Sequence, residues 1–281
     1  MKKLIFIIAV SLTSSFKAQV LTPKASPIAK IQQKVGLADI QIDYSRPSVN
    51  GRVIFGELIP YGQMWRLGAN ENTKITSSEA LIFGKDTLKA GTYALFAKPG
   101  ENNWEFYFYK DYSNWGLPEK WDDSKVALKV SASAVISKEF TENLTLQFEE
   151  LKSSSAKITL TWAQTKVTLP FALDTKTKVL ASIDKTMAGP SANDYHQAAT
   201  YYFNENLDLK KALEWSTKAV EMRGTSAYWM TRLKAQLQAA NGDFKGAIET
   251  AKLSMEAAKA DGDDAYVLAN QKSIEEWSKK R

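Results

Sequence analysis

The spacing of apolar residues changes once along this chain, near Asp174, and no other feature constrains the fold as strongly. Before that point apolar and polar residues alternate, as Ile40, Ile42 and Tyr44 do with their neighbours, which is typical of a β-strand with one buried face. After it apolar residues recur with the period of an amphipathic helix. With 281 residues the chain is long enough to bury a core in each part. We therefore expect two domains, all-β followed by all-α.

The β part is expected to occupy residues 28–172. Strand-like runs with turn signals between them lie at 28–35, 38–44, 74–77, 80–83, 91–98, 104–109, 126–135, 144–148 and 157–162, with 167–171 as an additional edge. This series of short strands without intervening helices predicts an antiparallel sandwich resembling a jelly roll. The run at 104–109 carries aromatic residues on both sides, so either both of its faces are covered or one is an exposed aromatic surface.

The α part, residues 173–281, contains an internal repeat with an offset of 35 residues. The recurring residues are Asp208, Leu209, Ala212, Leu213 and Ala219 in the first copy and Asp243, Phe244, Ala247, Ile248 and Ser254 in the second. Small residues at such positions let two antiparallel helices approach closely, and the pattern resembles the tetratricopeptide repeat. Helices at 177–187 and 264–279 are expected to flank the two copies. Such a stack either offers a groove to a protein partner or serves as a cap.

Residues 1–18 contain two lysines, a short apolar run and then small polar residues, which is the layout of a signal peptide. Residues 19–27 are expected to form a linker. The apolar run is too short to span a bilayer, so we expect no transmembrane anchor after signal removal and a periplasmic or extracellular protein. The absence of cysteine excludes disulfides, a lipid-anchor motif and thiol chemistry.

The formal net charge of +6 does not indicate a nucleic-acid partner. Three of the positive charges belong to lysines of the predicted signal peptide, and three more belong to the terminal residues 279–281. The remaining chain is close to neutral and has no basic stripe, so nucleic acid is not an expected partner.

Residues 45–72 break the alternation and carry polar and aromatic side chains in a segment rich in turn residues. The run YSRPSVNGRVIFGELIPYGQMWRLGANENTKIT, followed by GTYALFAKP, resembles a family of secreted bacterial proteins known as domain of unknown function twenty-nine eleven. The resemblance covers residues 26–170. It implies a β-rich exported domain, often followed by helical repeats, and brings no established catalytic residues.

Loops held by a rigid sheet often carry binding groups, so this segment is the first candidate for a polar-aromatic pocket. Arg46 and Arg66 would hold an anionic or hydroxyl-bearing group, and Trp65 would stack on the ligand. Asn70 and Glu71 would fix its orientation. The candidate ligand-binding residues are Tyr44, Arg46, Arg52, Tyr61, Trp65, Arg66, Asn70, Glu71 and Trp115.

A second aromatic loop at residues 110–124 places Trp115 and Trp121 near Asp122 and Asp123. Exposed tryptophans beside carboxylates are typical of sugar-binding surfaces, because the indole ring stacks on the apolar face of a pyranose. The alternative is that both tryptophans close the end of the sandwich, since large aromatic residues are mostly buried.

The single histidine, His196, and the absence of cysteine make a zinc site or a Ser-His-Asp triad unexpected, and no cofactor is expected. We expect His196 to be a packing residue. The catalytic candidates that remain are Asp43, Glu57 and Glu71, because two carboxylates across a cleft suffice for glycoside hydrolysis. In the alternative, Asp43 and Glu71 form ion pairs with arginines and hold the loop on the sheet.

Three functions are compatible with these observations. We prefer an exported, envelope-associated binding protein without catalytic activity, with a glycan or peptide ligand on the β part and a protein partner on the helical repeats. The second is a carboxylate-dependent glycoside hydrolase acting on envelope polysaccharide. The third is a structural adaptor without a small-molecule site.

Overall fold

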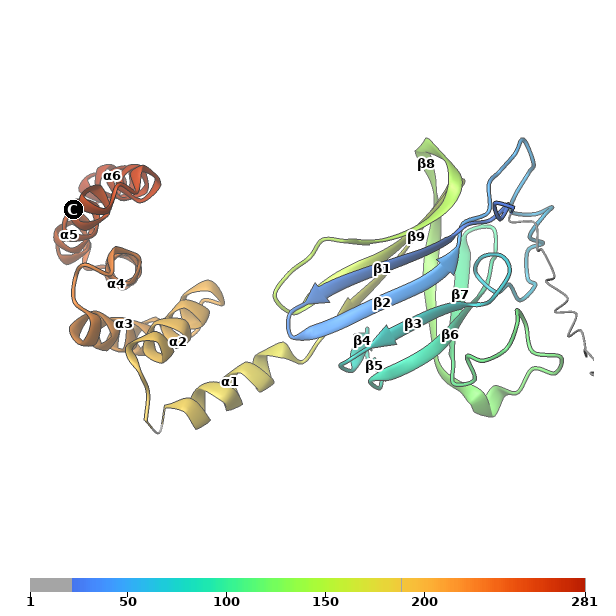
Figure 1. Cartoon of the computed structure of the whole chain (residues 1–281), viewed down its shortest axis with the longest axis horizontal. Helices are drawn as coiled ribbons and strands as arrows, with labels where there is room; N and C mark the ends of the chain where they lie inside the picture. The colour runs from blue at the N-terminus through green and yellow to red at the C-terminus, as the bar shows by residue number, and fades with distance from the viewer. Residues whose placement is uncertain (1–21, 188, 281) are drawn as a thin grey trace, which may run out of the picture. The chain divides into compact units, whose positions relative to one another are not determined.

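The computed structural model describes residues 22–187 and 189–280, and Figure 1 shows a β part followed by an α part. The chain divides into two compact units between Asp174 and Thr175. The predicted layout, all-β followed by all-α, is confirmed. The predicted signal peptide at residues 1–18 and the first residues of the predicted linker lie outside the described residues.

Within the described residues the β unit is one antiparallel sheet of nine strands, in the order β1-β2-β3-β6-β7-β8-β9-β4-β5. The strands are β1 (Ile28–Val35), β2 (Ala38–Ser45), β3 (Thr73–Ser77), β4 (Leu81–Phe83), β5 (Asp86–Leu88), β6 (Gly91–Lys98), β7 (Asn103–Tyr109), β8 (Val126–Glu149) and β9 (Ser155–Ala172). Neighbours in sequence are neighbours in the sheet, except that the β4–β5 hairpin crosses to the far edge and pairs with β9. Strand β5 was not expected from the sequence. It follows a tight turn at Gly84, which has a φ of 62° and interrupts the strand pattern.

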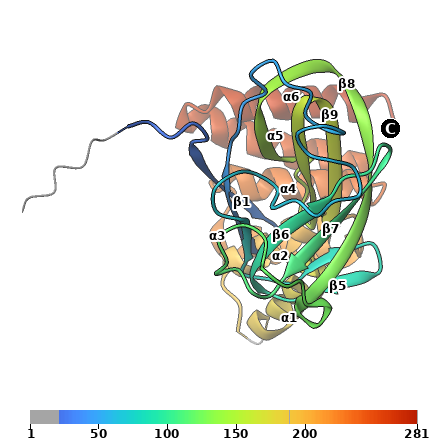
Figure 2. The same cartoon turned by 90° about the vertical axis from the view of Figure 1, so that its right-hand side faces the viewer.

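Strands β8 and β9 are each long, where two short strands were expected. Residues 126–133 of β8 pair with β7, and residues 134–149 pair with β9. The register of β8 shifts between Ile136 and Thr145, and bulged residues of this kind bend a strand strongly. Figure 2 shows β8 curving from the side of β7 to that of β9. The mostly polar stretch that resembled a loop is therefore the bend of one continuous strand.

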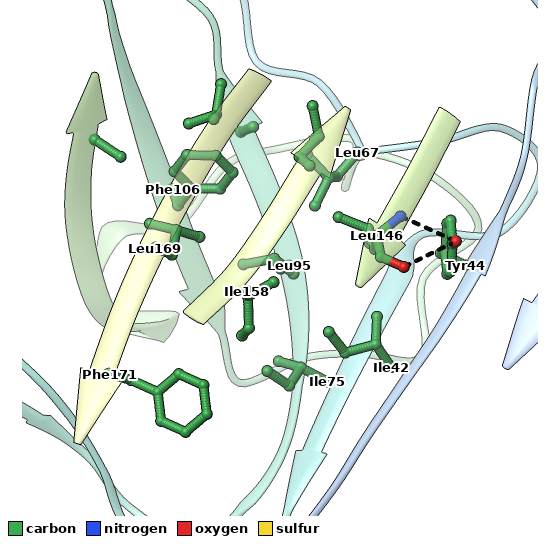
Figure 3. Packing of buried hydrophobic residues seen from close by; sticks show 14 of the residues in the cluster. Ile42, Tyr44, Leu67, Ile75, Leu95, Phe106, Leu146, Ile158, Leu169 and Phe171 are labelled. Carbon is green, nitrogen blue, oxygen red and sulfur yellow. Dashed lines mark hydrogen bonds between the residues drawn. The ribbon is translucent and has the colours of Figure 1, made fainter. Parts of the chain in front are cut away.

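The sheet folds over on itself around one apolar core, part of which is drawn in Figure 3. Ile42, Ile75 and Leu95 enter this core from β2, β3 and β6. Ile158 and Leu169 enter it from β9, and each of the five side chains is at most 3% exposed. Burying a side chain of this size contributes roughly 1.5–3 kcal/mol to the free energy of unfolding. The contact between the two layers of the folded sheet is therefore a major source of its stability.

Hydrogen bonds also join the two layers, just where β2 ends. The hydroxyl of Tyr44 accepts a hydrogen bond from the backbone N–H of Leu146 at 3.0 Å and donates to its carbonyl oxygen at 3.3 Å, as Figure 3 shows. A few residues later the N–H of Val49 donates to the carbonyl oxygen of Glu142 at 2.8 Å. The chain after β2 is therefore fixed to β8.

Strand β7 is covered on both faces. Trp104, Phe106 and Phe108 belong to the main core. Tyr109, on the opposite face, belongs to a smaller apolar cluster on the outside of β6 and β7 that also includes Trp121. The segment of residues 110–125 therefore lies over the outer face of the sheet. Both faces of this aromatic strand are covered, which was the first of the two alternatives.

The described residues of the α unit form six helices, none long and apolar enough to cross a membrane. They are α1 (Thr175–Thr186), α2 (Ala192–Asn204), α3 (Leu209–Arg223), α4 (Tyr228–Ala240), α5 (Phe244–Asp261) and α6 (Asp264–Ser278). Each helix from α2 to α5 packs against the next one in sequence.

The internal repeat corresponds to equivalent features at the start of α3 and α5. Asp208 and Asp243 are the N-caps, and their carboxylates accept hydrogen bonds from backbone N–H groups three residues later. Ala212 and Ala247, one turn into these helices, are fully buried. The first copy lacks the usual turn glycine, and Asn206 takes a left-handed conformation there with a φ of 48°. The predicted helical repeats are confirmed.

Candidate functional site

A small pocket of about 40 Å³ opens at the end of β2. It lies within the β unit, between the segment before β1, the outer face of β2 and β3, and the loop that covers them. Five predicted site residues line it, namely Asp43, Tyr44, Asn70, Glu71 and Trp115. The other lining residues, which the sequence did not indicate, are Lys24, Ile28, Ser45, Asn72 and Lys74.

The charged residues of the pocket reach it because of strand alternation. Asp43 on β2 lies opposite Lys74 on β3, and both are on the outer face because Ile42 and Ile75 point into the core. Lys74 Nζ lies 3.3 Å from a carboxylate oxygen of Glu71. Asp43 is 3.9 Å from the ammonium group of Lys30. Exposed ion pairs of this kind contribute little to stability, so these groups can exchange partners with a ligand.

Asn70 holds the floor of the pocket together. Its backbone is in the left-handed region, with a φ of 59°, a conformation that asparagine tolerates better than most residues. Its side-chain amide donates to the carbonyl oxygen of Ser26 at 3.2 Å and to the hydroxyl of Ser45 at 3.4 Å. The segment before β1 is thereby brought beside the end of β2, which explains why Lys24 lines the pocket.

Arg46 and Arg52 do not line the pocket, because their guanidinium groups bind to the fold itself. Arg46 donates to the carbonyl oxygen of Leu144 at 3.0 Å and to the hydroxyl of Thr145 at 2.7 Å. Arg52 donates to the carbonyl oxygens at positions 49 and 48, at 3.0 and 2.6 Å. The alternative expectation that acids hold these arginines is therefore wrong, since the arginines bind backbone and hydroxyl oxygens, and the acids face lysines.

Trp65, expected to stack on a ligand, is a core residue and is 6% exposed. Its ring stacks on that of Trp162 with centroids 5.8 Å apart, and its indole N–H donates to the carbonyl oxygen of Gly68 at 3.1 Å. Tyr61 and Glu57 are exposed, and neither lines the pocket. Of the carboxylates considered for catalysis, only Asp43 and Glu71 lie at the same pocket.

The two tryptophans of the 110–125 loop take opposite roles. Trp121 packs on Tyr109, with ring centroids 4.7 Å apart, and closes the outer face of the sheet. Trp115 is 68% exposed and forms a wall of the pocket. The packing alternative therefore holds for Trp121 alone, and Trp115 is exposed.

The same loop is held at its base by a network around Asp111. Its carboxylate accepts hydrogen bonds from the hydroxyl of Ser113 at 2.8 Å and from Lys125 Nζ at 3.1 Å. Together with a hydrogen bond from the backbone N–H of Ser113, these bonds lower the pKa of Asp111 from 3.8 to about 2. The loop therefore has an ionised anchor at neutral pH.

Asn72 and Arg66, which lie at and beside the pocket, have buried polar atoms without a partner in the described part of the chain. Asn72 is 3% exposed, and neither atom of its side-chain amide makes a hydrogen bond. The buried Nε of Arg66 is likewise unsatisfied. A side chain at Gly116 would lie 3.0 Å from a terminal nitrogen of Arg66, so the loop passes directly over this guanidinium group. Unsatisfied buried polar groups are rare in native proteins and mark places where a water molecule or a ligand supplies the partner.

His196 lies on α2 and is partly buried, and burial lowers its pKa. Its Nδ1 has no partner within the described residues. The described residues contain no cluster of histidine and acidic side chains that could hold a metal ion.

The fold and the pocket define a class of protein: a curved antiparallel β unit with a small polar pocket beside an exposed tryptophan, followed by helical repeats. Over residues 26–171 the chain matches the family described as "Protein of unknown function (DUF2911)". This match covers more than half of the chain, so the protein belongs to that family, as the resemblance of residues 26–170 predicted. No curated protein and no solved structure matches the chain.

Proposed function

We propose that this protein is an exported binding protein whose β unit recognises a saccharide at the pocket beside Trp115. The observation that carries the proposal is the exposed Trp115 ring at the rim of a pocket that also contains the unsatisfied amide of Asn72. An exposed indole ring stacks on the apolar face of a sugar, and the surrounding carboxylates, amides and lysines suit its hydroxyl groups.

The size of the pocket limits what enters it. A water molecule needs roughly 10–15 Å³ of such volume, so about 40 Å³ holds only a few heavy atoms. A complete pyranose ring does not fit inside. In the proposed complex the ring therefore lies on Trp115 at the rim, and one substituent of the ring enters the pocket.

A glycan array followed by calorimetric titration of the mature protein tests this function. Trp115→Ala is expected to weaken binding about tenfold or more, as truncation of a central aromatic contact does at other interfaces. The matched control is Trp229→Ala, because Trp229 is 38% exposed but lies in the α unit. Absence of any glycan ligand, or equal effects of the two substitutions, would refute the proposal.

Hydrolysis is a second candidate, because Asp43 and Glu71 line the same pocket. In a glycosidase one such carboxylate would protonate the leaving oxygen while the other acts as base or nucleophile. Release of reducing ends from an array-positive polysaccharide would support this candidate, provided that Asp43→Asn and Glu71→Gln each abolish it. Glu57→Gln serves as the control, since Glu57 is exposed outside the pocket. Unchanged polysaccharide after incubation with the wild type would eliminate hydrolysis.

The proposal also includes export and a protein partner for the helical repeats. Support for export comes from the arrangement of residues 1–18. Mass spectrometry of the protein recovered from the cell envelope is expected to show a chain that lacks this segment. Crosslinking of the full-length protein in cells, compared with a variant truncated after Asp174, would show whether a partner depends on the α unit. Recovery of the uncleaved chain in the cytoplasm would contradict export.

A further inference from the structure

Four side chains that belong to the outer face of the sheet or to the 110–125 loop above it have unsatisfied polar atoms. They are Arg66, Asn72, Tyr109 and Asn114, and none of the affected atoms has a hydrogen-bond partner in the described residues. Asn72 and Tyr109 are 3% and 1% exposed. The proposed saccharide contact at Trp115 involves only the rim of this region. It gives no role to the buried, unsatisfied groups beneath the rim.

Strand register places these groups together. Asp43, Lys74, Ala94 and Tyr109 form one row across β2, β3, β6 and β7, so Tyr109 is on the same outer face as the pocket. Asn72 directly precedes Thr73, whose N–H donates to the carbonyl oxygen of Arg66 at 3.3 Å. The backbones that carry Asn72 and Arg66 are therefore adjacent on this face of the sheet.

The loop covers this layer closely. Trp115 lines the pocket together with Asn72, and the next residue, Gly116, passes over Arg66. Gly116 has a φ of 80°, and a side chain there would lie 3.0 Å from Arg66. Glycine is favoured in this position both by the backbone conformation and by the close approach. The Trp115-Gly116 turn thus separates the open pocket from the guanidinium group.

The charges of this region do not balance. With Lys30, which faces Asp43, the pocket and the adjoining Arg66 carry four positive side chains against two negative ones, Asp43 and Glu71. Each of the two acids already faces a lysine. The guanidinium of Arg66 has neither an ion pair nor a hydrogen bond in the described part of the chain. A partly buried charge without a counter-charge is unfavourable, and a ligand with one negative charge would relieve it.

We propose that Arg66 and Asn72 form a carboxylate-binding subsite beneath the Trp115-Gly116 turn, and that the ligand is an acidic saccharide of the uronic acid class. This inference deepens the proposed function and rests on it. The planar guanidinium group matches a carboxylate with two parallel hydrogen bonds. The Asn72 amide donates to the carboxylate and accepts from a neighbouring hydroxyl group of the ring. Because Gly116 lies over Arg66, entry of the carboxylate requires this turn to move outward.

Oligogalacturonate and its methyl ester test this subsite, because esterification removes the charge while the sugar rings remain. We expect the full-length mature protein to bind the acid at least tenfold more tightly than the ester. Added salt is expected to reduce this preference. Arg66→Gln should abolish the preference by weakening binding of the acid far more than binding of the ester. Arg52→Gln is the matched control and should retain the preference, because Arg52 binds the carbonyl oxygens of residues 48 and 49.

Thermal unfolding separates a binding role of these residues from a structural one. Asn72→Leu should weaken binding of both compounds while the melting temperature stays unchanged or rises, because leucine has a similar size and needs no hydrogen-bond partner. A lower melting temperature with unchanged binding would overturn the role of Asn72. A lower melting temperature of Arg66→Gln with the preference for the acid intact would overturn the role of Arg66.

The two proposals fail in distinguishable ways. Equal binding of acid and ester, with dependence on Trp115, would overturn the carboxylate subsite and leave saccharide binding intact. Binding of neutral glycans but not of acidic ones would likewise overturn the carboxylate subsite and leave saccharide binding intact. If the wild type binds no saccharide at all, both proposals are wrong.

Discussion

Residues 46–65 and residues 66–72 follow each other in sequence, yet Arg46, Arg52 and Trp65 in the first region have an opposite environment to Arg66 and Asn72 in the second. In the first region Arg46 and Arg52 donate hydrogen bonds to oxygen atoms of the fold, and the indole of Trp65 donates to a backbone carbonyl. In the second region the side chains of Arg66 and Asn72 contain buried atoms that have no partner among the described residues. The difference shows that residue type alone does not mark a binding site. A polar group whose partners lie within the fold builds the fold, and one without partners is available to a ligand.

The largest expected difference in the free energy of unfolding is between variants that replace Trp65 in the core and Trp115 at the pocket. Trp65→Ala should lower the free energy of unfolding by about 3–5 kcal/mol, because it leaves a cavity beside Trp162 in the core. Trp115→Ala should change it by less than about 0.5 kcal/mol, since that ring is 68% exposed. Urea denaturation followed by circular dichroism measures both. Similar losses for the two variants would contradict the assignment of Trp65 to the core and Trp115 to the surface.

A smaller effect is expected from the arginines. Arg46→Met should lower the free energy of unfolding by about 1–3 kcal/mol, because the carbonyl oxygen of Leu144 loses its donor at a partly buried position. Arg66→Met should leave it within about 0.5 kcal/mol, since no hydrogen bond of that side chain is lost. The same denaturation experiment applies. A larger loss for Arg66→Met than for Arg46→Met would reverse the comparison.

Tyr44→Phe should have a still smaller effect, about 1 kcal/mol, because the ring stays in place and only the hydrogen bonds to Leu146 are lost. Hydrogen exchange at the amide of Leu146 should become faster in this variant than in the wild type. Tyr61→Phe is the control, since that side chain is 41% exposed and lies outside the pocket. Unchanged exchange at Leu146 would show that the hydroxyl of Tyr44 does not fix β8.

The sequence predicts local structure well where alternation is continuous. Expected strands at 28–35 and 91–98 coincide with β1 and β6, because each has a regular pattern between clear turns. The continuity of β8 was missed, because a bulged strand and a loop both interrupt the alternation. The three-residue β5 is too short to show a period.

The site was predictable only in part. Five expected residues do line the pocket, since loops beside a sheet end carry polar groups. Lys24 was missed because it is brought there by a tertiary hydrogen bond between Asn70 and Ser26. Asn72 carries no sequence signal that distinguishes it from Asn70, and only burial without a partner identifies it. Trp65 and Trp115 likewise differ only in their tertiary surroundings.

The smallest expected effect is a pH-dependent change of the 110–125 loop, which lies over Arg66. Hydrogen bonds from Ser113 and Lys125 lower the pKa of Asp111 from 3.8 to about 2. The anchor is therefore fully present above pH 3.8 and is lost as the pH falls toward 2. We expect the fluorescence of Trp121 to change over this interval before the circular dichroism of the sheet does, because the base of the loop is held by the exposed contacts of Asp111 and the sheet is held by its core.

Two variants make this titration specific. Asp111→Asn should remove the fluorescence transition near pH 2, because the amide cannot ionise. Asp86→Asn is the matched control, since Asp86 is an exposed acid on β5 outside this network, and it should leave the transition unchanged. If fluorescence and circular dichroism change together in the wild type, the loop and the sheet unfold as one unit. The Trp115-Gly116 turn could then not open independently, and the entry route proposed for a carboxylate would be closed.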